Sequence, residues 1–258
     1  MISTAHTKLI RSLGQKKYRD LHRLFLVEGE KMVLELAESD PERLFHIKEL
    51  YATPEWIESH HAQLQSWKTT FYEATPREIK RVSNLMTPQP VIALVSMPEA
   101  LFNAAELLNT PVLAFESLRD PGNMGTIIRT ADWFGIRQII CTPDSTDLYN
   151  PKVVQSTMGA ITRVKVHYLD IETLLKSREM KTKAVLGTFL EGENIYEISL
   201  EPDSFILFGN ESHGLSKRFD SHIRQRISIP SFSRNEKGSE SLNVASSVAV
   251  VCSELRRR

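Results

Sequence analysis

Arg129 is the first residue whose type and position suggest chemistry. It lies in an expected helix, which we predict to run from about Met124 to Gly135 after a turn at residues 120–123, Asp-Pro-Gly-Asn. The apolar residues at helical spacing are predicted to face the core: Ile127, Ala131 and Phe134. Because each residue turns a helix by about 100°, Arg129 then points away from that core. An arginine beside such a turn is suited to bind an anion, although a solvated surface side chain fits the spacing equally well.

Two later stretches hold further polar side chains that chemistry can use. Glu211 and His213 lie in an expected turn, and a His beside a Glu permits acid–base catalysis. Ser241 is placed to cap the last expected helix, and capping alone explains a serine there. Asn243 falls one turn into that helix, where an asparagine usually has a hydrogen-bond partner or faces solvent.

The elements that must position these residues alternate between strand and helix. Strands are expected at residues 112–116, 137–141, 163–168, 183–188, 205–208 and 227–229. Helices are expected at residues 124–134, 151–160, 171–177 and 242–256. This alternation predicts an α/β domain with a mostly parallel sheet and helices on both faces.

A smaller α/β pattern precedes it. Helices are expected at residues 8–18, 28–37 and 54–65, and strands at residues 23–27, 46–51 and 91–95. The stretch around Met97-Pro98 interrupts the pattern and Pro111 opens the next apolar run. We therefore predict a first domain over residues 1–97, a linker over 98–110 and a second domain over 111–258.

Composition excludes several classes of protein. No apolar run is long enough for a transmembrane helix, and the first residues lack the apolar stretch of a signal peptide. Cys141 and Cys252 are far apart, which excludes a disulfide scaffold and a Cys-rich zinc site. We therefore expect a cytoplasmic protein that needs no metal and no membrane.

The overall charge is balanced, with 32 basic and 32 acidic side chains, but its distribution is uneven. Basic residues gather between residues 8 and 31 and again between residues 217 and 237. Such segments bind phosphates or are simply solvated faces. The candidate phosphate-binding residues, which would contact a nucleic acid, are Lys8, Arg11, Lys16, Lys17, Arg19 and Arg23.

Familiar nucleotide-binding motifs are missing. Gly122-Asn123-Met124-Gly125 does not supply the G-x-G-x-x-G pattern that a Rossmann fold requires, and no P-loop is present. A nucleotide-like cofactor must therefore bind by another route.

Three stretches, in order, resemble the motifs of the SpoU (TrmH-type) RNA ribose 2′-O-methyltransferases of the SPOUT class. They are DPGNMGTIIRTADWFG at residues 120–135, LFGNESHGL at residues 207–215, and Ile229-Pro230 followed by Ser241-Leu242-Asn243-Val244. Residues 15–35, QKKYRDLHRLFLVEGEKMVLE, resemble the opening of the RNA substrate-binding domain that precedes many of these enzymes.

The resemblance implies a fold and an activity. The fold is a small L30e-like α/β domain followed by a SPOUT-type parallel sheet whose C-terminal part is tied into a deep trefoil knot, which holds S-adenosylmethionine. The activity is methyl transfer to a ribose 2′-hydroxyl of structured RNA, with ribosomal RNA favoured over transfer RNA. The family also implies a homodimer. The apolar stripe Val244, Val248, Val251 and Leu255 fits either a core helix or a dimer helix.

The resemblance also implies site residues. Those at the reaction centre are Asn123, Arg129, Glu211, Ser241 and Asn243. Those around the cofactor are Leu186, Gly187, Thr188, Phe208, Gly209, Asn210, Gly214, Ile229, Pro230 and Leu242. His213 falls on a position that the family pattern leaves free, so we interpret it as a loop residue. Glu211 is expected to orient Arg129 or Asn123.

Arg129 occupies the position that the family's mechanism uses as a general base. A guanidinium is essentially never deprotonated near neutral pH, so we expect Arg129 to fix a phosphate and stabilise the developing alkoxide. The link at residues 231–240, SFSRNEKGSE, is longer than the family's usual one. Two other classes of function stay open, a non-catalytic RNA-binding or ribosome-assembly factor and a small-molecule α/β enzyme.

Overall fold

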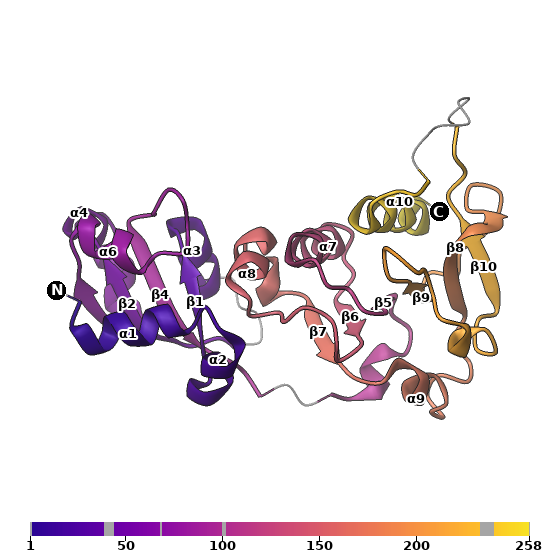
Figure 1. Ribbon diagram of the computed structural model, residues 1–258, viewed down its shortest axis with the longest axis horizontal. Helices are drawn as coiled ribbons and strands as arrows, with labels where there is room; N and C mark the ends of the chain where they lie inside the picture. The colour runs from indigo at the N-terminus through magenta and orange to yellow at the C-terminus, as the bar shows by residue number, and fades with distance from the viewer. Residues whose placement is uncertain (1, 39–43, 68, 100–101, 233–239, 258) are drawn as a thin grey trace. The chain divides into compact units, whose positions relative to one another are not determined.

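The computed structural model describes residues 2–38, 44–67, 69–99, 102–232 and 240–257 (Figure 1). The chain divides into two compact units, the first formed by Met1–Glu99 and Asp147–Arg163, the second by Ala100–Thr146 and Val164–Arg258. The first unit ends close to the predicted linker. The sequence pattern did not indicate that residues 147–163 pack with the first unit.

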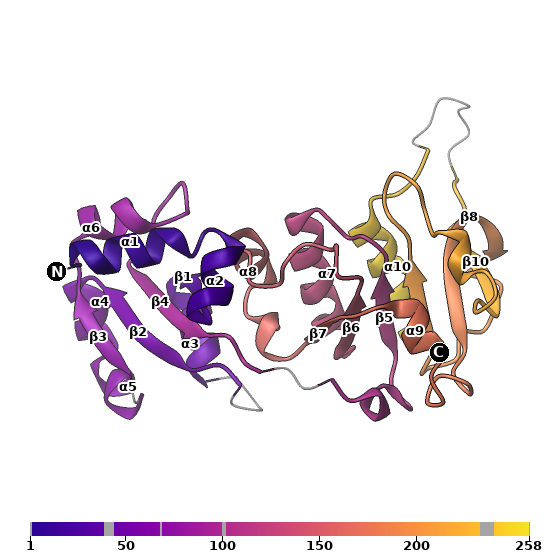
Figure 2. The same cartoon turned by 60° about the horizontal axis from the view of Figure 1, so that its bottom comes forward.

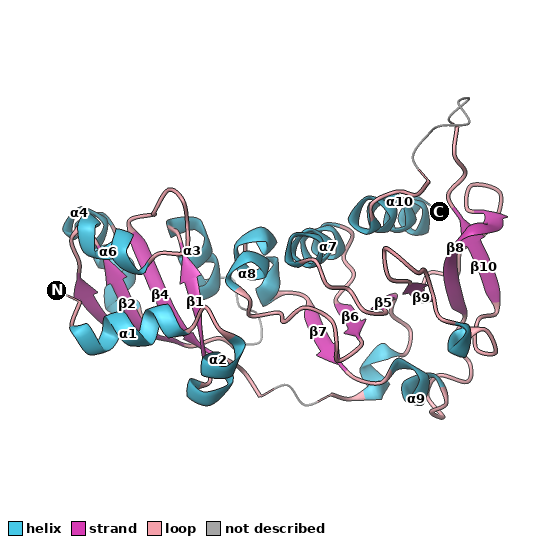
Figure 3. Ribbon diagram, viewed as in Figure 1, coloured by secondary structure: helices cyan, strands magenta, loops and turns pink. Residues whose placement is uncertain are grey.

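The described residues of the first unit form a four-stranded sheet in the order β1-β4-β2-β3 (Figure 3). The strands are β1 (Leu24–Glu28), β2 (Ile47–Ala52), β3 (Thr70–Glu73) and β4 (Val91–Ser96). The helices are α1 (Thr4–Ser12), α2 (Lys16–His22), α3 (Glu30–Glu38), α4 (Pro54–Ser59), α5 (His61–Ser66), α6 (Pro76–Val82) and α8 (Pro151–Thr157). Strand β4 runs antiparallel to β1 and β2, while β2 and β3 are parallel, so the predicted small α/β domain is confirmed.

Several element boundaries in this unit differ from the prediction. The single helix expected at residues 8–18 is two helices, because α1 ends at Ser12 and α2 begins only at Lys16. The helix expected at residues 54–65 is likewise broken at His60, whose φ of −116° leaves the helical region. Strand β3 and helix α6 were not predicted from the sequence.

Helix α6 carries a start signal that sequence analysis could have used. Thr75 and Glu78 form a capping box, in which each side chain accepts a hydrogen bond from the other residue's backbone N–H. Pro76 occupies the first helical position, where its missing N–H costs nothing.

The described residues of the second unit form a six-stranded sheet in the order β10-β8-β9-β5-β6-β7. The strands are β5 (Val112–Phe115), β6 (Gln138–Cys141), β7 (Lys165–Tyr168), β8 (Val185–Asn194), β9 (Phe205–Phe208) and β10 (Gln225–Ser228). Every neighbouring pair is parallel, which confirms the predicted parallel sheet. The chain runs from β5 outward to β7 and then returns to the other side of β5, so the order reverses between β5 and β9. Parallel sheets bind ligands at the carboxyl ends of strands beside such a reversal.

The helices of the second unit are α7 (Pro121–Trp133), α9 (Ile171–Leu175) and α10 (Val244–Arg257). Figures 1 and 2 show α10 alongside α7. The core strands are buried along their whole length, as continuous apolar runs in a parallel sheet should be. The rings of Phe115 and Phe208 stack at 5.1 Å between centroids across β5 and β9.

Both helices that carry candidate site residues begin differently from the prediction. Helix α7 starts at Pro121, so the turn predicted at residues 120–123 is wrong: Asp120 caps the helix by accepting from the backbone N–H of Asn123 at 2.8 Å. Helix α10 starts at Val244, and Asn243 rather than Ser241 caps it.

Two smaller expectations are also corrected. Phe134 is half-buried at the end of α7, outside the fully buried stripe of Ile127 and Ala131. Strand β8 continues to Asn194, beyond the end predicted at residue 188, with a register shift where it pairs with β10. Among the helices in the described part of the chain, none is long and apolar enough to cross a bilayer.

Candidate active site

Three side chains that are distant in sequence form a continuous hydrogen-bonded chain in the second unit. The amide nitrogen Nδ2 of Asn243 donates to Oδ1 of Asn123 at 3.0 Å. Nδ2 of Asn123 then donates to Oε1 of Glu211 at 2.9 Å. We call these residues the Asn–Asn–Glu chain. The structure thus brings together one residue from each of the three motifs that sequence analysis identified.

Each asparagine of this chain is fixed by the first turn of a helix. The backbone N–H of Asn123 donates to the Asp120 carboxylate, which anchors it to the start of α7. Oδ1 of Asn243 accepts from the backbone N–H of Ala245 at 2.9 Å, so the side chain that reaches Asn123 also caps α10. Two helices therefore start at this point, where their N-terminal N–H groups favour negative charge.

Glu211 is held by a narrow turn rather than by a helix. The backbone N–H of Asn210 donates to the carbonyl of Gly214 at 3.1 Å, and the N–H of Gly214 donates back to Asn210 at 2.8 Å. Gly209 admits no side chain, because a Cβ atom there would lie 2.2 Å from the carbonyl carbon of Gly214. The turn at residues 210–214 is thus closed against the end of β9, with an exposed Glu211 at its tip.

Arg129 lies on the exposed side of α7, as its spacing predicted. Within the described residues its side chain forms no hydrogen bond or ion pair, whereas the Glu211 carboxylate accepts a hydrogen bond from Asn123. The expected partner of Glu211 is therefore Asn123, and the guanidinium of Arg129 stays available to an external anion. Ser241 is exposed and precedes the cap of α10.

Most of the predicted cofactor residues lie on three neighbouring strands or directly after them, while Gly214 closes the turn at residues 210–214 and Leu242 precedes α10. Leu186 and Gly187 pair with Ile206 and Leu207 of β9, and the Thr188 hydroxyl donates to the carbonyl of Leu207 at 3.1 Å. Phe208 ends β9, Gly209 and Asn210 follow it, and Ile229 and Pro230 follow β10. These strands are parallel neighbours, but β8 continues to Asn194, so Leu186 and Gly187 lie near its start, level with the carboxyl end of β9.

Exposed apolar side chains lie on the same segments as several of the predicted cofactor residues. Leu190, Phe232 and Leu242 are 75%, 80% and 53% exposed, and each lies on a different one of the segments that carry the predicted cofactor residues. A purine ring can pack against exposed apolar groups, while backbone groups at strand ends form hydrogen bonds with its polar edge. Residues 233–239, most of the long link, fall outside the described part of the chain.

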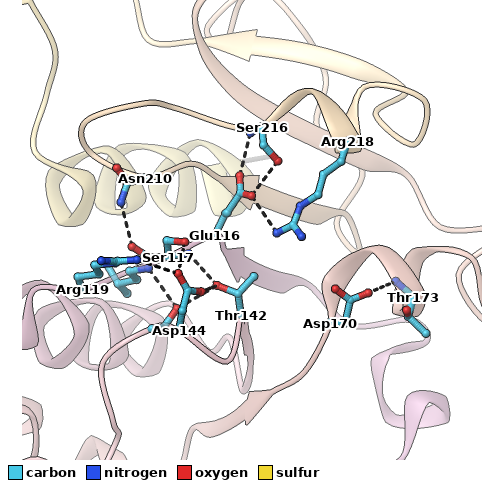
Figure 4. Close-up of polar contacts among 12 residues, drawn as sticks. Glu116, Ser117, Arg119, Thr142, Asp144, Asp170, Thr173, Asn210, Ser216 and Arg218 are labelled. Atoms are coloured by element: carbon cyan, nitrogen blue, oxygen red, sulfur yellow. Dashed lines mark hydrogen bonds and ion pairs between the residues drawn. The ribbon is translucent and has the colours of Figure 1, made fainter.

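A polar network that the sequence pattern did not indicate holds the loop leading into α7. The carboxylate of Asp144, which follows β6, accepts from the hydroxyls of Ser117 at 2.5 Å and Thr142 at 2.6 Å and from Arg119 at 3.2 Å (Figure 4). Hydrogen bonds from Ser117 and then Thr142 lower the pKa of Asp144 to about 2. Ser117 has a φ of +54°, which is unusual for a residue with a side chain. Polar residues directly after a buried strand were the available signal.

A cavity of about 370 Å³ opens beside this network. Its walls include Ser117, Arg119, Asn210 and His213, at the carboxyl ends of β5 and β9. Nδ1 of His213 lies 3.3 Å from Oδ1 of Asn210, and His213 is not part of the Asn–Asn–Glu chain.

Cysteine and metal chemistry find no support in the described residues. Burial raises the pKa of the Cys141 thiol, and it raises that of Cys252 to about 12. Neither thiol is therefore a reactive nucleophile. No group of three or more His, Cys, Asp or Glu side chains in the described part of the chain is arranged to hold a metal.

The candidate RNA-binding residues of the first unit divide into two kinds. Five are exposed: Lys8, Arg11, Lys16, Lys17 and Arg23. Arg19 is only 2% exposed, and its guanidinium donates to Asp147 at 2.5 and 3.0 Å and to the carbonyl of Leu13 at 2.8 Å. Because these contacts engage it inside the unit, we withdraw Arg19 from the RNA-binding set.

Solved structures show the class to which this fold belongs. An AdoMet-bound rRNA methyltransferase from Sinorhizobium meliloti is 27% identical and covers 100% of this chain and 97% of that one, with a TM-score of 0.82. A TrmH-family protein from Porphyromonas gingivalis is 33% identical over 100% of this chain and 99% of that one, with a TM-score of 0.83. The fold is that of the SPOUT methyltransferases.

Sequence comparison identifies the family. The model described as "SpoU rRNA Methylase family" matches residues 110–253, and the one described as "MRM3-like substrate binding domain" matches residues 5–93. The chain belongs to the SpoU rRNA Methylase family, which confirms the resemblance. It is 28% identical to the 23S rRNA (guanosine(2553)-2′-O)-methyltransferase RlmP of Bacillus subtilis (strain 168), over 95% of this chain and 94% of that protein.

Proposed function

We propose that this protein transfers the methyl group of S-adenosylmethionine to a ribose 2′-hydroxyl of ribosomal RNA. The observation that carries the proposal is the Asn–Asn–Glu chain, in which three separate motif segments meet at the carboxyl edge of a parallel sheet. The relative with the named 23S rRNA activity spans nearly the whole chain, which supports ribosomal over transfer RNA.

S-adenosylmethionine, when bound, supplies a methyl group on a sulfonium for an in-line displacement. The chain's own residues must then hold the attacking oxygen at about 3 Å and stabilise its developing charge. In this proposal the Asn–Asn–Glu chain fixes the shape of the site, and Ser241 lies beside the reacting groups. Arg129 binds the phosphate of the target nucleotide and stabilises the alkoxide, since a guanidinium does not act as a base near neutral pH.

The cofactor site in this proposal is the edge formed by β8, β9 and β10. Leu186, Gly187, Thr188, Phe208, Gly209, Asn210, Gly214, Ile229, Pro230 and Leu242 surround the adenosine. We also propose that the C-terminal part of the second unit is tied into the deep trefoil knot of the SPOUT class. The exposed apolar side chains of Leu190, Phe232 and Leu242 support the assignment, because a bound purine would cover them.

We further propose a homodimer that packs through α7 and α10. Trp133 on α7 is 85% exposed, and a large aromatic side chain in that state is typical of a protein interface. Two buried, widely separated cysteines fit a reducing cytoplasm, which is our proposed location. The first unit contributes the exposed basic side chains of α1 and α2 to RNA binding.

The proposed function is tested by mapping 2′-O-methyl groups in ribosomal and transfer RNA from a strain that lacks the gene and from its parent. We expect a single ribosomal position to lose its methyl group and to regain it when the gene is returned. Loss of a methyl group only in transfer RNA would show that the substrate is transfer RNA instead of ribosomal RNA. No change at any position, together with no binding of labelled S-adenosylmethionine, would leave a non-catalytic RNA-binding factor.

A further inference from the structure

Glu116 is a buried carboxylate that none of the motifs explains. It follows the last residue of β5 and is 8% exposed. Its Oε2 accepts from the backbone N–H of Ser216 at 2.8 Å, while its Oε1 accepts from the Ser216 hydroxyl at 2.8 Å and from Arg218 at 2.9 Å (Figure 4). All three donors come from one short segment that lies about a hundred residues later in the sequence.

That segment directly continues the turn that carries Glu211. The turn at residues 210–214 is closed by its own two backbone hydrogen bonds and by the tight contact at Gly209. Glu116 fixes its far end through Ser216, and the neighbouring carbonyl of Ser117 accepts from the side chain of Asn210 at 3.1 Å at its near end. Both ends of the turn are thus tied to the end of β5.

The chemistry of this contact requires a carboxylate. Two oxygens accept three hydrogen bonds, one from a cation, whereas an amide would offer a single acceptor and direct an N–H₂ group at a donor. Burying a carboxylate costs free energy unless all its hydrogen bonds are made. If packing were the only role of this contact, apolar side chains would fill the same space without that cost. The hydrogen bonds of the Glu116 carboxylate go to Ser216 and Arg218 and not to Asn123 or Asn243, so we expect its effect on these asparagines to pass through the turn.

We propose that Glu116 is a positioning residue for methyl transfer. It sets the turn at residues 210–214 so that Glu211 meets Asn123, and it thereby fixes the Asn–Asn–Glu chain. This inference rests on the proposed function.

The central variant is Glu116→Gln, with Ser216→Ala as a milder variant that keeps the carboxylate and removes one donor. We expect Glu116→Gln to lower kcat by about tenfold or more, with the KM for S-adenosylmethionine changed less than about threefold. Ser216→Ala should lower kcat by less. The matched control is Glu106→Gln, which removes a carboxylate paired with Lys165 at 3.1 Å in the same unit and should leave kcat unchanged.

A double-mutant cycle with Glu211→Gln separates positioning from general stabilisation. If Glu116 acts through Glu211, then Glu116→Gln adds no further loss of kcat when Glu211 is already Gln. Additive losses, or a kcat in Glu116→Gln equal to that of wild type, would overturn the proposal. So would a fall in kcat that Glu106→Gln reproduces.

Hydrogen exchange gives a readout that does not require activity. Glu116→Gln should speed exchange of the Asn210 and Gly214 amides while those of β5 and β9 stay protected. Unchanged exchange in the turn would overturn the role of Glu116, whether or not the wild-type protein methylates RNA. Faster exchange in Glu116→Gln, together with a wild-type protein that methylates no RNA, would count against the proposed function and not against the role of Glu116 in holding the turn.

Discussion

Two arginines, one in each unit, look alike in the sequence and differ completely in the structure. Arg19 and Arg129 were both expected to meet RNA. Arg19 is buried and its guanidinium donates to Asp147 and to the carbonyl of Leu13, whereas Arg129 is exposed and its side chain forms no hydrogen bond or ion pair within the described residues. A buried charge must be paired inside the protein, while an exposed charge without a partner can bind a ligand. The first unit thus uses its arginine for folding, and we propose that the second uses its arginine for binding.

The largest effect is expected from breaking the buried pair. Asp147→Ala leaves the Arg19 guanidinium buried with only one hydrogen bond to a carbonyl, so the variant should lose about 3–5 kcal/mol of unfolding free energy. Chemical denaturation measures this. The matched control is Asp20→Ala, which removes an exposed pair with Lys16 at 3.5 Å and should cost no more than about 1 kcal/mol. Equal effects of the two variants would contradict the structural role of Arg19.

The next largest effect is expected from substituting Arg129, and it should appear in kcat rather than in the melting temperature. Arg129→Ala should lower kcat by about 10²–10³, the usual cost of removing one stabilising donor, with the melting temperature nearly unchanged. Arg129→Lys should restore little of the rate, because an ammonium cannot offer the same fork of donors. If Arg129 also binds the phosphate of the target nucleotide, both variants should bind RNA more weakly. Normal RNA affinity in Arg129→Ala would mean that Arg129 only stabilises the developing alkoxide.

A smaller effect should come from the exposed basic residues of the first unit. Lys17→Ala should weaken RNA binding a few-fold and reduce the slope of log affinity against log salt by about one, as loss of one phosphate contact does. Binding titrations at several salt concentrations measure this. The control is Lys48→Ala, because Lys48 is an exposed lysine on β2 outside the basic segment. Equal changes in RNA affinity and in salt slope in both variants would contradict a localised RNA-binding surface on α1 and α2.

The smallest effect concerns the loop that leads into α7. Because hydrogen bonds depress the pKa of Asp144 to about 2, its contribution to stability is present above the ordinary pKa of an aspartate and is lost as pH falls towards 2. Asp144→Asn should therefore melt below wild type by a constant amount above about pH 5, and the difference should shrink at lower pH. A difference that grows on acidification would contradict the network.

The sequence predicted the elements and motifs well because those signals are local. The apolar run at residues 112–115 and the helical spacing around Arg129 depend on neighbours a few residues away, and both were confirmed. The start of α10 was misplaced because Ser241 and Asn243 are both good caps, and only the contact with Asn123 selects the second. Propensity alone cannot separate them.

Partners that are distant in sequence could not be predicted. The pairing of Arg19 with Asp147 and of Glu116 with Ser216 depends on how the chain returns to each unit, which no periodicity encodes. The motifs placed Asn123, Glu211 and Asn243 in one site by resemblance, but the order of their hydrogen bonds came only from the structure.

The most direct test of the central claim is methyl transfer from labelled S-adenosylmethionine to ribosomal RNA by the purified protein and by three variants, Asn123→Ala, Glu211→Ala and Asn243→Ala. If these residues act as one unit, the wild-type protein labels a ribose 2′-oxygen, each variant loses most of its rate, and any double variant loses no more than its worse single variant. Label on a base, or losses that add independently, would contradict the account.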